Sequence, residues 1–220
     1  MGIVISHGDG IKLSRKGLLA MEFLAKKVLE FWFGDIGEDG QVKPEIIKQW
    51  FKKDEEFDSL VKKKFADYLD TAYMGAFDRW ISEPLGSVAL IVMLDQFPRN
   101  IYRGHAKSFH FDAKAISIAK LFADSVLHLQ VLPVFGQFGL MPFMHSEDLE
   151  VQKQGLDHFK LLKDKCPDYA KSSMENVYDF AVKHHDIIER FGRFPHRNDI
   201  LGRESTTEEL SFLKEPGSSF

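Results

Sequence analysis

Three short polar segments interrupt an otherwise apolar sequence and hold most of the side chains that could do chemistry. They are Asp95–Arg99, His145–Glu147 and His184–Arg197. Arginine can hold a carboxylate or phosphate group with two parallel hydrogen bonds, and an ordinary histidine exchanges protons near neutral pH. Both residue types occur beside carboxylates in these segments, which suits the binding of a small anion next to an acid–base group.

In the first segment, Asp95 and Gln96 follow directly after a run of apolar or small residues. A carboxylate at the end of a buried helix needs a cation or several hydrogen-bond donors to offset the cost of burial. Two interpretations stay open. Asp95 pairs with Arg99 or with a distant arginine and fixes the loop, or the polar residues of the segment line a pocket, namely Asp95, Gln96, Arg99 and Asn100.

The second segment is explained in part by helix capping. Ser146 can cap the helix that follows it, and an acidic residue such as Glu147 is favourable in a first helical turn. His145 comes just before this cap, where its ring can point into the interior. A single histidine in such a place is more often a hydrogen-bonded structural residue than a ligand.

The third segment has the most unusual composition. His184 falls on an apolar helical stripe, and Gly192 is placed to end that helix. Basic residues then crowd the turn, namely Arg190, Arg193, His196 and Arg197. Each arginine on its own can neutralise a helix end or pair with a carboxylate elsewhere in the chain. The cluster as a whole favours a binding site.

Several residues could donate nitrogen or oxygen to a metal ion, namely His145, Glu147, His184, His185, Asp186 and His196. His185 and Glu189 also have the i,i+4 spacing that places two side chains on one helix face. Against a metal site, the sequence has neither an HExxH motif nor a cysteine cluster, and the nearby arginines would repel a cation. Glycine-rich nucleotide-binding motifs and a GxSxG motif are absent as well. We therefore expect no metal and no cofactor.

The composition argues against several classes of function. With 220 residues, 44% of them hydrophobic, the chain can form one domain with a proper core. Its formal net charge of -4 argues against nucleic-acid binding. No apolar stretch reaches the roughly 18–20 residues of a transmembrane helix. The single cysteine, Cys166, fits a reducing, cytoplasmic compartment. We predict an N-terminal extension over residues 1–14 and a single helical domain over residues 15–220.

Apolar residues recur at helical spacing nearly everywhere, and no segment alternates like a strand. The apolar run 85–94 predicts a central buried helix that begins at Pro84 and ends where Phe97 meets Pro98. Further helices are predicted over residues 19–32, 44–51, 54–81, 112–129, 146–165, 172–191 and 206–214, with residues 133–144 a buried turn or short helix. Predicted N-caps are Asp54, Asp112, Ser146 and Thr206, the last with Glu209 in a capping box. The expected fold class is all-α, built from antiparallel helical hairpins.

Several longer strings resemble domain-of-unknown-function family 924. They are LDQFPRN at 94–100, PFMHSED at 142–148, RFGRFPHRN at 190–198 and LGRES at 201–205. The resemblance runs from about residue 28 to the C-terminus, and one departure is His185, where we expect arginine in the family. It implies an all-helical, tetratricopeptide-like fold in a mostly bacterial family, and a place where the long strings meet in space. It implies no activity.

We predict that the polar segments form a pocket for a small anionic ligand, with Arg99, Arg193 and Arg197 as anion contacts. The remaining predicted pocket residues are Asp95, Gln96, Asn100, Glu147 and His184. His145 or His196 is the expected general acid or base, in a hydrolytic reaction. Two alternatives stay open: a peptide-binding module of the tetratricopeptide type, and a structural network that fixes helix packing. The oligomeric state is also left open.

Overall fold

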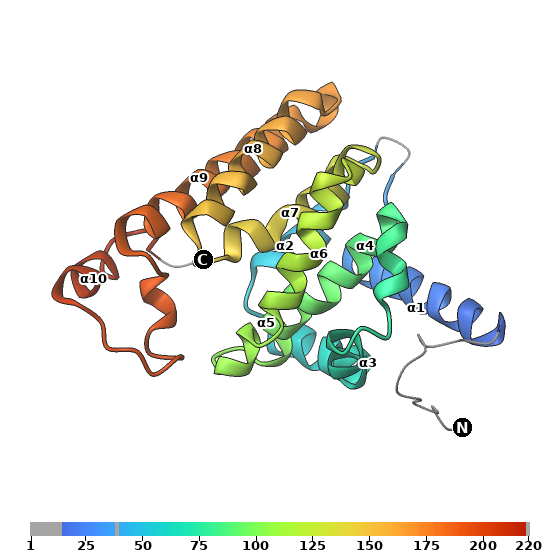
Figure 1. Ribbon diagram of the computed structural model, residues 1–220, viewed down its shortest axis with the longest axis horizontal. Coiled ribbons are helices and arrows are strands. Elements are labelled where there is room, and N and C mark those ends of the chain that lie inside the picture. Colours follow the sequence, from blue (N-terminus) through green and yellow to red (C-terminus); the bar gives the residue numbers. More distant parts are fainter. Residues whose placement is uncertain (1–14, 38–39, 219–220) are drawn as a thin grey trace.

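The computed structural model describes residues 15–37 and 40–218, so the predicted N-terminal extension lies outside the described residues. As predicted, the described part of the chain is all-helical, and its one β feature is an isolated antiparallel bridge between Ile36 and Val42. The α-helices, drawn in Figure 1, are α1 (Arg15–Phe33), α2 (Pro44–Phe51), α3 (Glu55–Tyr73), α4 (Pro84–Ile91), α5 (Phe97–Ile101), α6 (Asp112–Asp124), α7 (Pro133–His145), α8 (Leu149–Lys165), α9 (Lys171–Phe191) and α10 (Thr207–Phe212).

Six shorter helical segments connect them. Five are 3-10 helices, namely η1 (Asp78–Ser82), η3 (Ala106–Phe109), η4 (Leu127–Leu129), η5 (Asp168–Ala170) and η6 (Pro195–Arg197). The sixth, η2 (Val92–Gln96), is a π-helical turn between α4 and α5. The predicted buried helix therefore begins at Pro84, as expected, but it does not stop at Phe97.

Helix α4 and the π-helical turn form the centre of the core. Every residue from Ser87 to Asp95 is fully buried, because helices α1, α6 and α7 pack against α4. A helix that is apolar around its whole circumference is stable only in such surroundings. Aromatic rings fill the neighbouring space, and Trp32 contacts both Phe97 and Phe138 edge-on, each at 5.8 Å between centroids. The C-terminal end of the apolar helix is thereby held in a rigid environment.

Helices α8 and α9 lie side by side along much of their length and extend away from this core (Figure 1). Both also contact α7. Where α8 begins and α9 ends, a second small cluster joins Ile187, Ile188 and Phe194 with half-buried apolar neighbours that include Phe212 of α10. The segment after α9 is therefore anchored by apolar contacts with both α9 and α10. A tetratricopeptide-like superhelix stays a prediction.

The predicted helix end at Phe97–Pro98 is wrong, and the reason is the π-helical turn. Pro98 has no N–H, and its ring would collide with the carbonyl group four residues earlier in a regular α-helix. The chain widens instead, and the N–H of Phe97 donates to the carbonyl oxygen of Val92, five residues back. The helix continues as α5 through Ile101. Such turns occur often at functional sites.

Other boundaries differ for local reasons. Helix α3 stops at Tyr73 rather than near residue 81, because Gly75 adopts a φ of 90° that a helix cannot continue. Helix α6 stops at Asp124 rather than near residue 129, because Val126 adopts a left-handed conformation with a φ of 57°. Asp112 is the first residue of α6 and not its cap. The segment after Leu132 is a full helix of 13 residues.

Most of the predicted caps are confirmed. Asp54 accepts two backbone N–H groups at the start of α3, and Gly192 ends α9 with a φ of 68°. Thr206 and Glu209 form the predicted capping box. The cap of α8 is Asp148 rather than Ser146, whose hydroxyl oxygen instead accepts the N–H of Asp148. Within the described chain, no helix combines the length and apolarity that a membrane crossing requires.

Candidate functional site

Two helix interruptions place Asp95 and His145 against each other. Asp95 belongs to the π-helical turn three residues before Pro98, and His145 ends α7 three residues after Pro142. The Nδ1 atom of His145 lies 2.8 Å from Oδ1 of Asp95. The amide of Gln96 donates to the other carboxylate oxygen of Asp95. The first two predicted segments therefore meet, 50 residues apart in the chain.

The Asp95–His145 contact fixes the tautomer of the histidine. Burial alone would raise the pKa of Asp95, but His145, Arg99 and Gln96 together hold it below its ordinary value, so Asp95 is a carboxylate. A carboxylate only accepts hydrogen bonds, so Nδ1 of His145 carries the proton and donates it. The lone pair of a neutral His145 ring is then on Nε2. This is how a buried aspartate orients a catalytic histidine in the Ser-His-Asp triad.

A cavity of about 270 Å³ lies beside this pair. Its wall comes from the π-helical turn, the start of α6, the end of α7 and the segment after α9. The charged or titratable residues on the wall are Asp95, Asp112, His145, Glu147 and Arg197, and apolar positions such as Phe109, Ile116 and Leu201 complete it. All three predicted polar segments therefore contribute to one cavity.

Arg197 has an unusual environment for a charged side chain. It is only 7% exposed. Its guanidinium carbon lies 4.7 Å from the ring centroid of Phe109 and 4.4 Å from that of Phe194. Within the described part of the chain, the guanidinium forms no ion pair and no hydrogen bond. Burial, reinforced by the charge of nearby Arg99, lowers the pKa of Arg197 to about 10, so the group stays charged at neutral pH.

The carboxylates on the cavity wall already have partners. Asp112 accepts Nη2 of Arg99 at 2.7 Å, and Arg99 also donates to the carbonyl oxygen of Ser108. Glu147 accepts both terminal nitrogens of Arg203, at 2.6 and 3.0 Å.

Asp95 is engaged by His145 and Gln96, as described above. Among the charged residues on the wall, Arg197 is thus left without an ion-pair partner in the described structure. A buried guanidinium in this state is costly unless an anion compensates for it.

Glu147 also positions the segment that carries Arg197. Its Oε1 atom accepts the backbone N–H of Phe194 at 2.8 Å, and Arg203 donates to the carbonyl oxygen of Phe194. Burial would raise the pKa of Glu147, but the bonds from Arg203 and Phe194 hold it lower than usual. Glu147, in the short link between α7 and α8, therefore helps to hold the turn that follows α9.

His184 and His196 lie near the cavity as neutral rings. The His184 ring centroid lies 6.3 Å from that of His145, and its Nδ1 lies 2.7 Å from the carbonyl oxygen of Phe180. Burial lowers the pKa of His184 to about 3 and that of His196 to about 4. Of the two predicted acid–base residues, His145 is the one on the cavity wall.

Two of the predicted ligand-binding residues bond to other side chains instead. Arg193 donates to both carboxylate oxygens of Glu209, at 2.6 and 2.8 Å, and this pairing lowers the pKa of Glu209 to about 2. Asn100 donates to Asp58 of α3 at 2.8 Å. Neither Arg193 nor Asn100 is on the cavity wall. Arg99 is at its edge, against Phe109 and Asp112.

Sequence reasoning did not single out Phe109, Leu201 and Arg203 as site residues. Phe109 lies in a short 3-10 helix whose period is too brief to read, and it contacts two guanidinium groups. Leu201 and Arg203 lie within the LGRES string, so the resemblance held the one signal that pointed to them.

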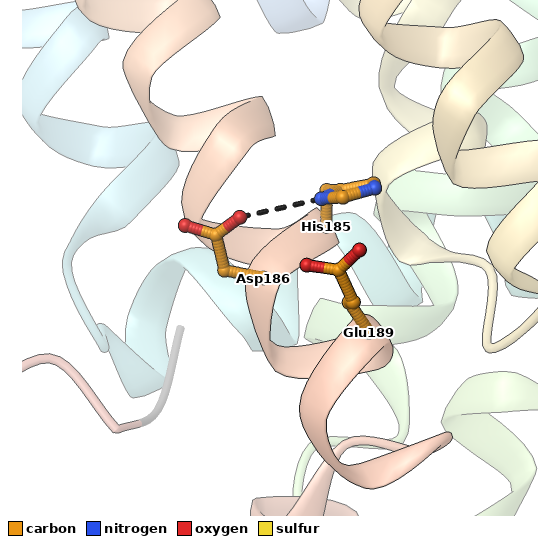
Figure 2. Close-up of side chains that lie close together, drawn as sticks. All are labelled: His185, Asp186 and Glu189. Carbon is orange, nitrogen blue, oxygen red and sulfur yellow. Dashed lines mark hydrogen bonds and ion pairs between the residues drawn. The ribbon is translucent and has the colours of Figure 1, made fainter.

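The donors considered for a metal fall into separate groups, because His145 and Glu147 are on the cavity wall and His185 and Asp186 are not. His185, Asp186 and Glu189 lie together on α9, with their ligand atoms within 4.8 Å of one another (Figure 2). His185 Nδ1 lies 3.3 Å from Asp186 Oδ1. Both acidic residues are exposed. Exposed acidic groups are common without an ion, so this proximity alone does not indicate a metal site.

Comparison with known proteins places most of the chain in one family. A profile of the family described as "Bacterial protein of unknown function (DUF924)" matches residues 28–217. The solved structure of a protein of unknown function from Agrobacterium tumefaciens is similar, with 33% sequence identity and a TM-score of 0.73, over 88% of this chain and 98% of that one. No curated protein matches the chain.

Proposed function

The chain belongs to DUF924, a bacterial family of unknown function, and we propose that its cavity binds a small organic anion on Arg197. The unpaired, buried guanidinium of Arg197 carries the proposal. Arginine suits this task because its planar donors match the two oxygens of a carboxylate or phosphate. Arg99, which was predicted to contact the anion, is not part of this proposal, because its guanidinium is already bonded to Asp112 and Ser108.

We further propose that the reaction is hydrolysis, with His145 as the general base. Asp95 holds the Nδ1 proton, so Nε2 can accept a proton from a water molecule. The water oxygen then bonds to the electrophilic carbon or phosphorus of the ligand. The bond to the leaving group breaks, and the imidazolium returns the proton to that group. His145 is supported for this role by its place on the same wall as Arg197.

A thermal-unfolding screen tests the binding proposal. The purified protein is heated with acetate, phosphate, sulfate or divalent metals, beside the Arg197→Met variant. An anion that binds the native state stabilises it, by about 2.7 kcal/mol at one hundred times its Kd. The melting temperature rises as a result. We expect this shift for wild type and its loss in Arg197→Met.

Arg190→Met is the matched control. Arg190 also lies over aromatic rings, Phe191 and Phe212, and it pairs with Glu208, but it is exposed and does not line the cavity. The control should keep the anion-induced shift. An equal shift in Arg197→Met, or a shift with metals alone, would contradict the proposal.

A structural network is the second candidate for part of the predicted set, and specific bonds favour it there. The Arg193–Glu209 and Arg203–Glu147 pairs are both two-pronged and both fasten the chain after α9. Arg193→Ala should therefore lower the melting temperature without removing the anion-induced shift. Loss of the shift at an unchanged melting temperature would instead restore Arg193 as a ligand contact.

A further inference from the structure

A second hollow adjoins the cavity around Arg197. This outer hollow has a volume of about 590 Å³ and is lined by Ala106, Lys107, Phe109, His110 and Leu201. Phe109 and Leu201 also line the inner cavity of about 270 Å³. The two spaces therefore share a wall of two apolar side chains, with Arg197 on the inner side.

We infer that the two spaces together hold a monocarboxylate with an apolar tail. The carboxylate lies on Arg197, and the tail runs outward over Phe109 and Leu201. This inference rests on the proposed function and adds the class of ligand to it. Two features support it: the charge of the inner wall and the sizes of the two spaces.

The charge of the inner wall favours a single negative charge on the ligand. Arg197 is the one cation without an ion-pair partner among the described wall residues, and three carboxylates surround it, on Asp95, Asp112 and Glu147. One guanidinium neutralises one carboxylate. A phosphate dianion would add a second charge close to these acids with no cation left to meet it, because Arg99 and Arg203 are already paired.

The sizes of the two spaces favour a ligand longer than a simple anion. Small-molecule sites typically enclose about 300–1,000 Å³. The inner cavity alone falls just below this range, and the outer hollow, which is widely open to solvent, extends it. The outer wall also suits an apolar group. Its one lysine, Lys107, lies over the ring of Tyr102 at 4.7 Å and is bonded to that tyrosine, so its charge is already engaged.

Calorimetric titration with acetate, butyrate and hexanoate tests the inference. Each methylene group buried in the outer hollow should tighten binding by up to about fourfold. Ala106→Trp would fill the outer hollow from an exposed position of η3, and it leaves the inner wall untouched. We expect this variant to bind hexanoate no better than acetate, with acetate binding unchanged. Ser117→Trp, at an exposed position of α6 outside both walls, should keep the gain with chain length.

The outcomes separate this inference from the proposed function. Equal affinity for acetate and hexanoate, lost in Arg197→Met, would overturn the tail site and leave anion binding intact. A gain with chain length that persists in Ala106→Trp would also overturn the tail site. Tighter binding of methyl phosphate than of acetate would overturn the single-charge argument. Failure of every carboxylate to bind would overturn both proposals.

Discussion

At the scale of single residues, the cavity combines a charge that is costly to bury with a histidine whose proton is held in place. Arg197 has aromatic neighbours but no ion-pair partner in the described structure. His145 is fixed by Asp95, which is fully buried. Natural proteins retain such unfavourable arrangements mostly where function needs them, so stability and binding should respond in opposite directions to substitution.

Arg197→Met tests this expectation. Methionine keeps much of the apolar contact with Phe109 and Phe194 and removes the buried charge. We expect the free energy of unfolding without ligand to stay within about 1 kcal/mol of wild type, or to rise, since replacing a buried ionic group by an apolar one is often neutral or stabilising. Urea unfolding measures it. A loss of about 3–5 kcal/mol, the scale of a broken buried ion pair, would favour a structural role for Arg197.

Asp95→Asn should release the tautomer of His145. An asparagine presents one acceptor and one donor, so it cannot accept from both His145 and Gln96 as the carboxylate does. In wild type, ¹⁵N NMR should show a protonated Nδ1 and an unprotonated Nε2 at His145, and the variant should show a mixture. Asp112→Asn, on the same cavity wall but bonded to Arg99, is the control that should keep the wild-type signals. A variant spectrum identical to wild type would remove Asp95 as the orienting group.

At the scale of elements, the cavity depends on features that interrupt or crowd regular helices. The π-helical turn carries Asp95, the end of α7 carries His145, and the turn after α9 carries Arg197. These three pieces come from different parts of the chain, and side-chain bonds or close helix packing hold them together. Substitutions that loosen these bonds or this packing should change the cavity.

Glu147→Gln should loosen the turn that carries Arg197. The neutral amide loses the two-pronged pairing with Arg203 and weakens the bond from the Phe194 N–H. Hydrogen exchange at the Phe194 amide should become faster, and acetate affinity should fall because Arg197 is held less firmly. Glu208→Gln, the partner of exposed Arg190, should change neither quantity. Unchanged exchange at Phe194 would show that the turn is held by its apolar cluster alone.

Gly139→Ala should force α6 and α7 apart. A Cβ atom at Gly139 would come within 2.2 Å of the Phe122 ring, which is fully buried and cannot move aside. We expect a loss of about 1–3 kcal/mol in the free energy of unfolding, the usual cost of overpacking, against a gain of about 1 kcal/mol in helix propensity. Both helices line the cavity, so acetate affinity should also fall. A more stable variant would mean that the helices can separate freely.

At the scale of the whole molecule, several histidines are buried or half-buried as neutral rings. Burial lowers the pKa of His128 to about 4, as it does for His184 and His196, which have values of about 3 and 4. Unfolding returns each ring to an ordinary pKa near 6.5. The unfolded chain therefore binds more protons than the native protein in mildly acidic solution.

Stability should consequently fall as the pH drops from about 6.5 toward 4. The contribution of each histidine is fully present above its unfolded pKa and decreases with a slope of at most about 1.4 kcal/mol per pH unit. Below about 4.5 the lowered pKa values of Glu147 and Glu209 add a loss of the same sign. Urea unfolding between pH 7.5 and 5 measures the slope, and a flat profile would contradict the buried-histidine account.

His128→Phe should reduce that slope. His128 is fully buried against Phe122 and His158, and neither of its ring nitrogens bonds to a residue in the described structure. Phenylalanine keeps the ring contacts and removes the proton uptake, so stability at pH 7 should hold or rise. His110→Phe, at an exposed position, should leave the slope unchanged. An equal slope in both variants would assign the acid sensitivity to other groups.

The helical fold, most caps and the general location of the site followed from local patterns. The apolar circumference of 85–94 indicated a buried helix because only a surrounded helix can hide all of its faces. Asp54, Gly192 and the Thr206–Glu209 box indicated helix ends, because capping bonds join residues only two to four positions apart. The clustering of arginine and histidine with the family-like strings drew attention to the three segments that line the cavity.

The tertiary structure decided which charges are already neutralised, because that depends on residues far apart in the chain. Arg193 and Arg197 are four positions apart and look alike in sequence. Arg193 meets the carboxylate of Glu209, whereas the buried Arg197 lines a cavity whose carboxylates are bonded to other residues. A periodic pattern reports the side of a helix that faces inward, but the partner that waits there is set by how the helices pack. For that reason the sequence identified the segments, and packing selected Asp95, His145 and Arg197 within them.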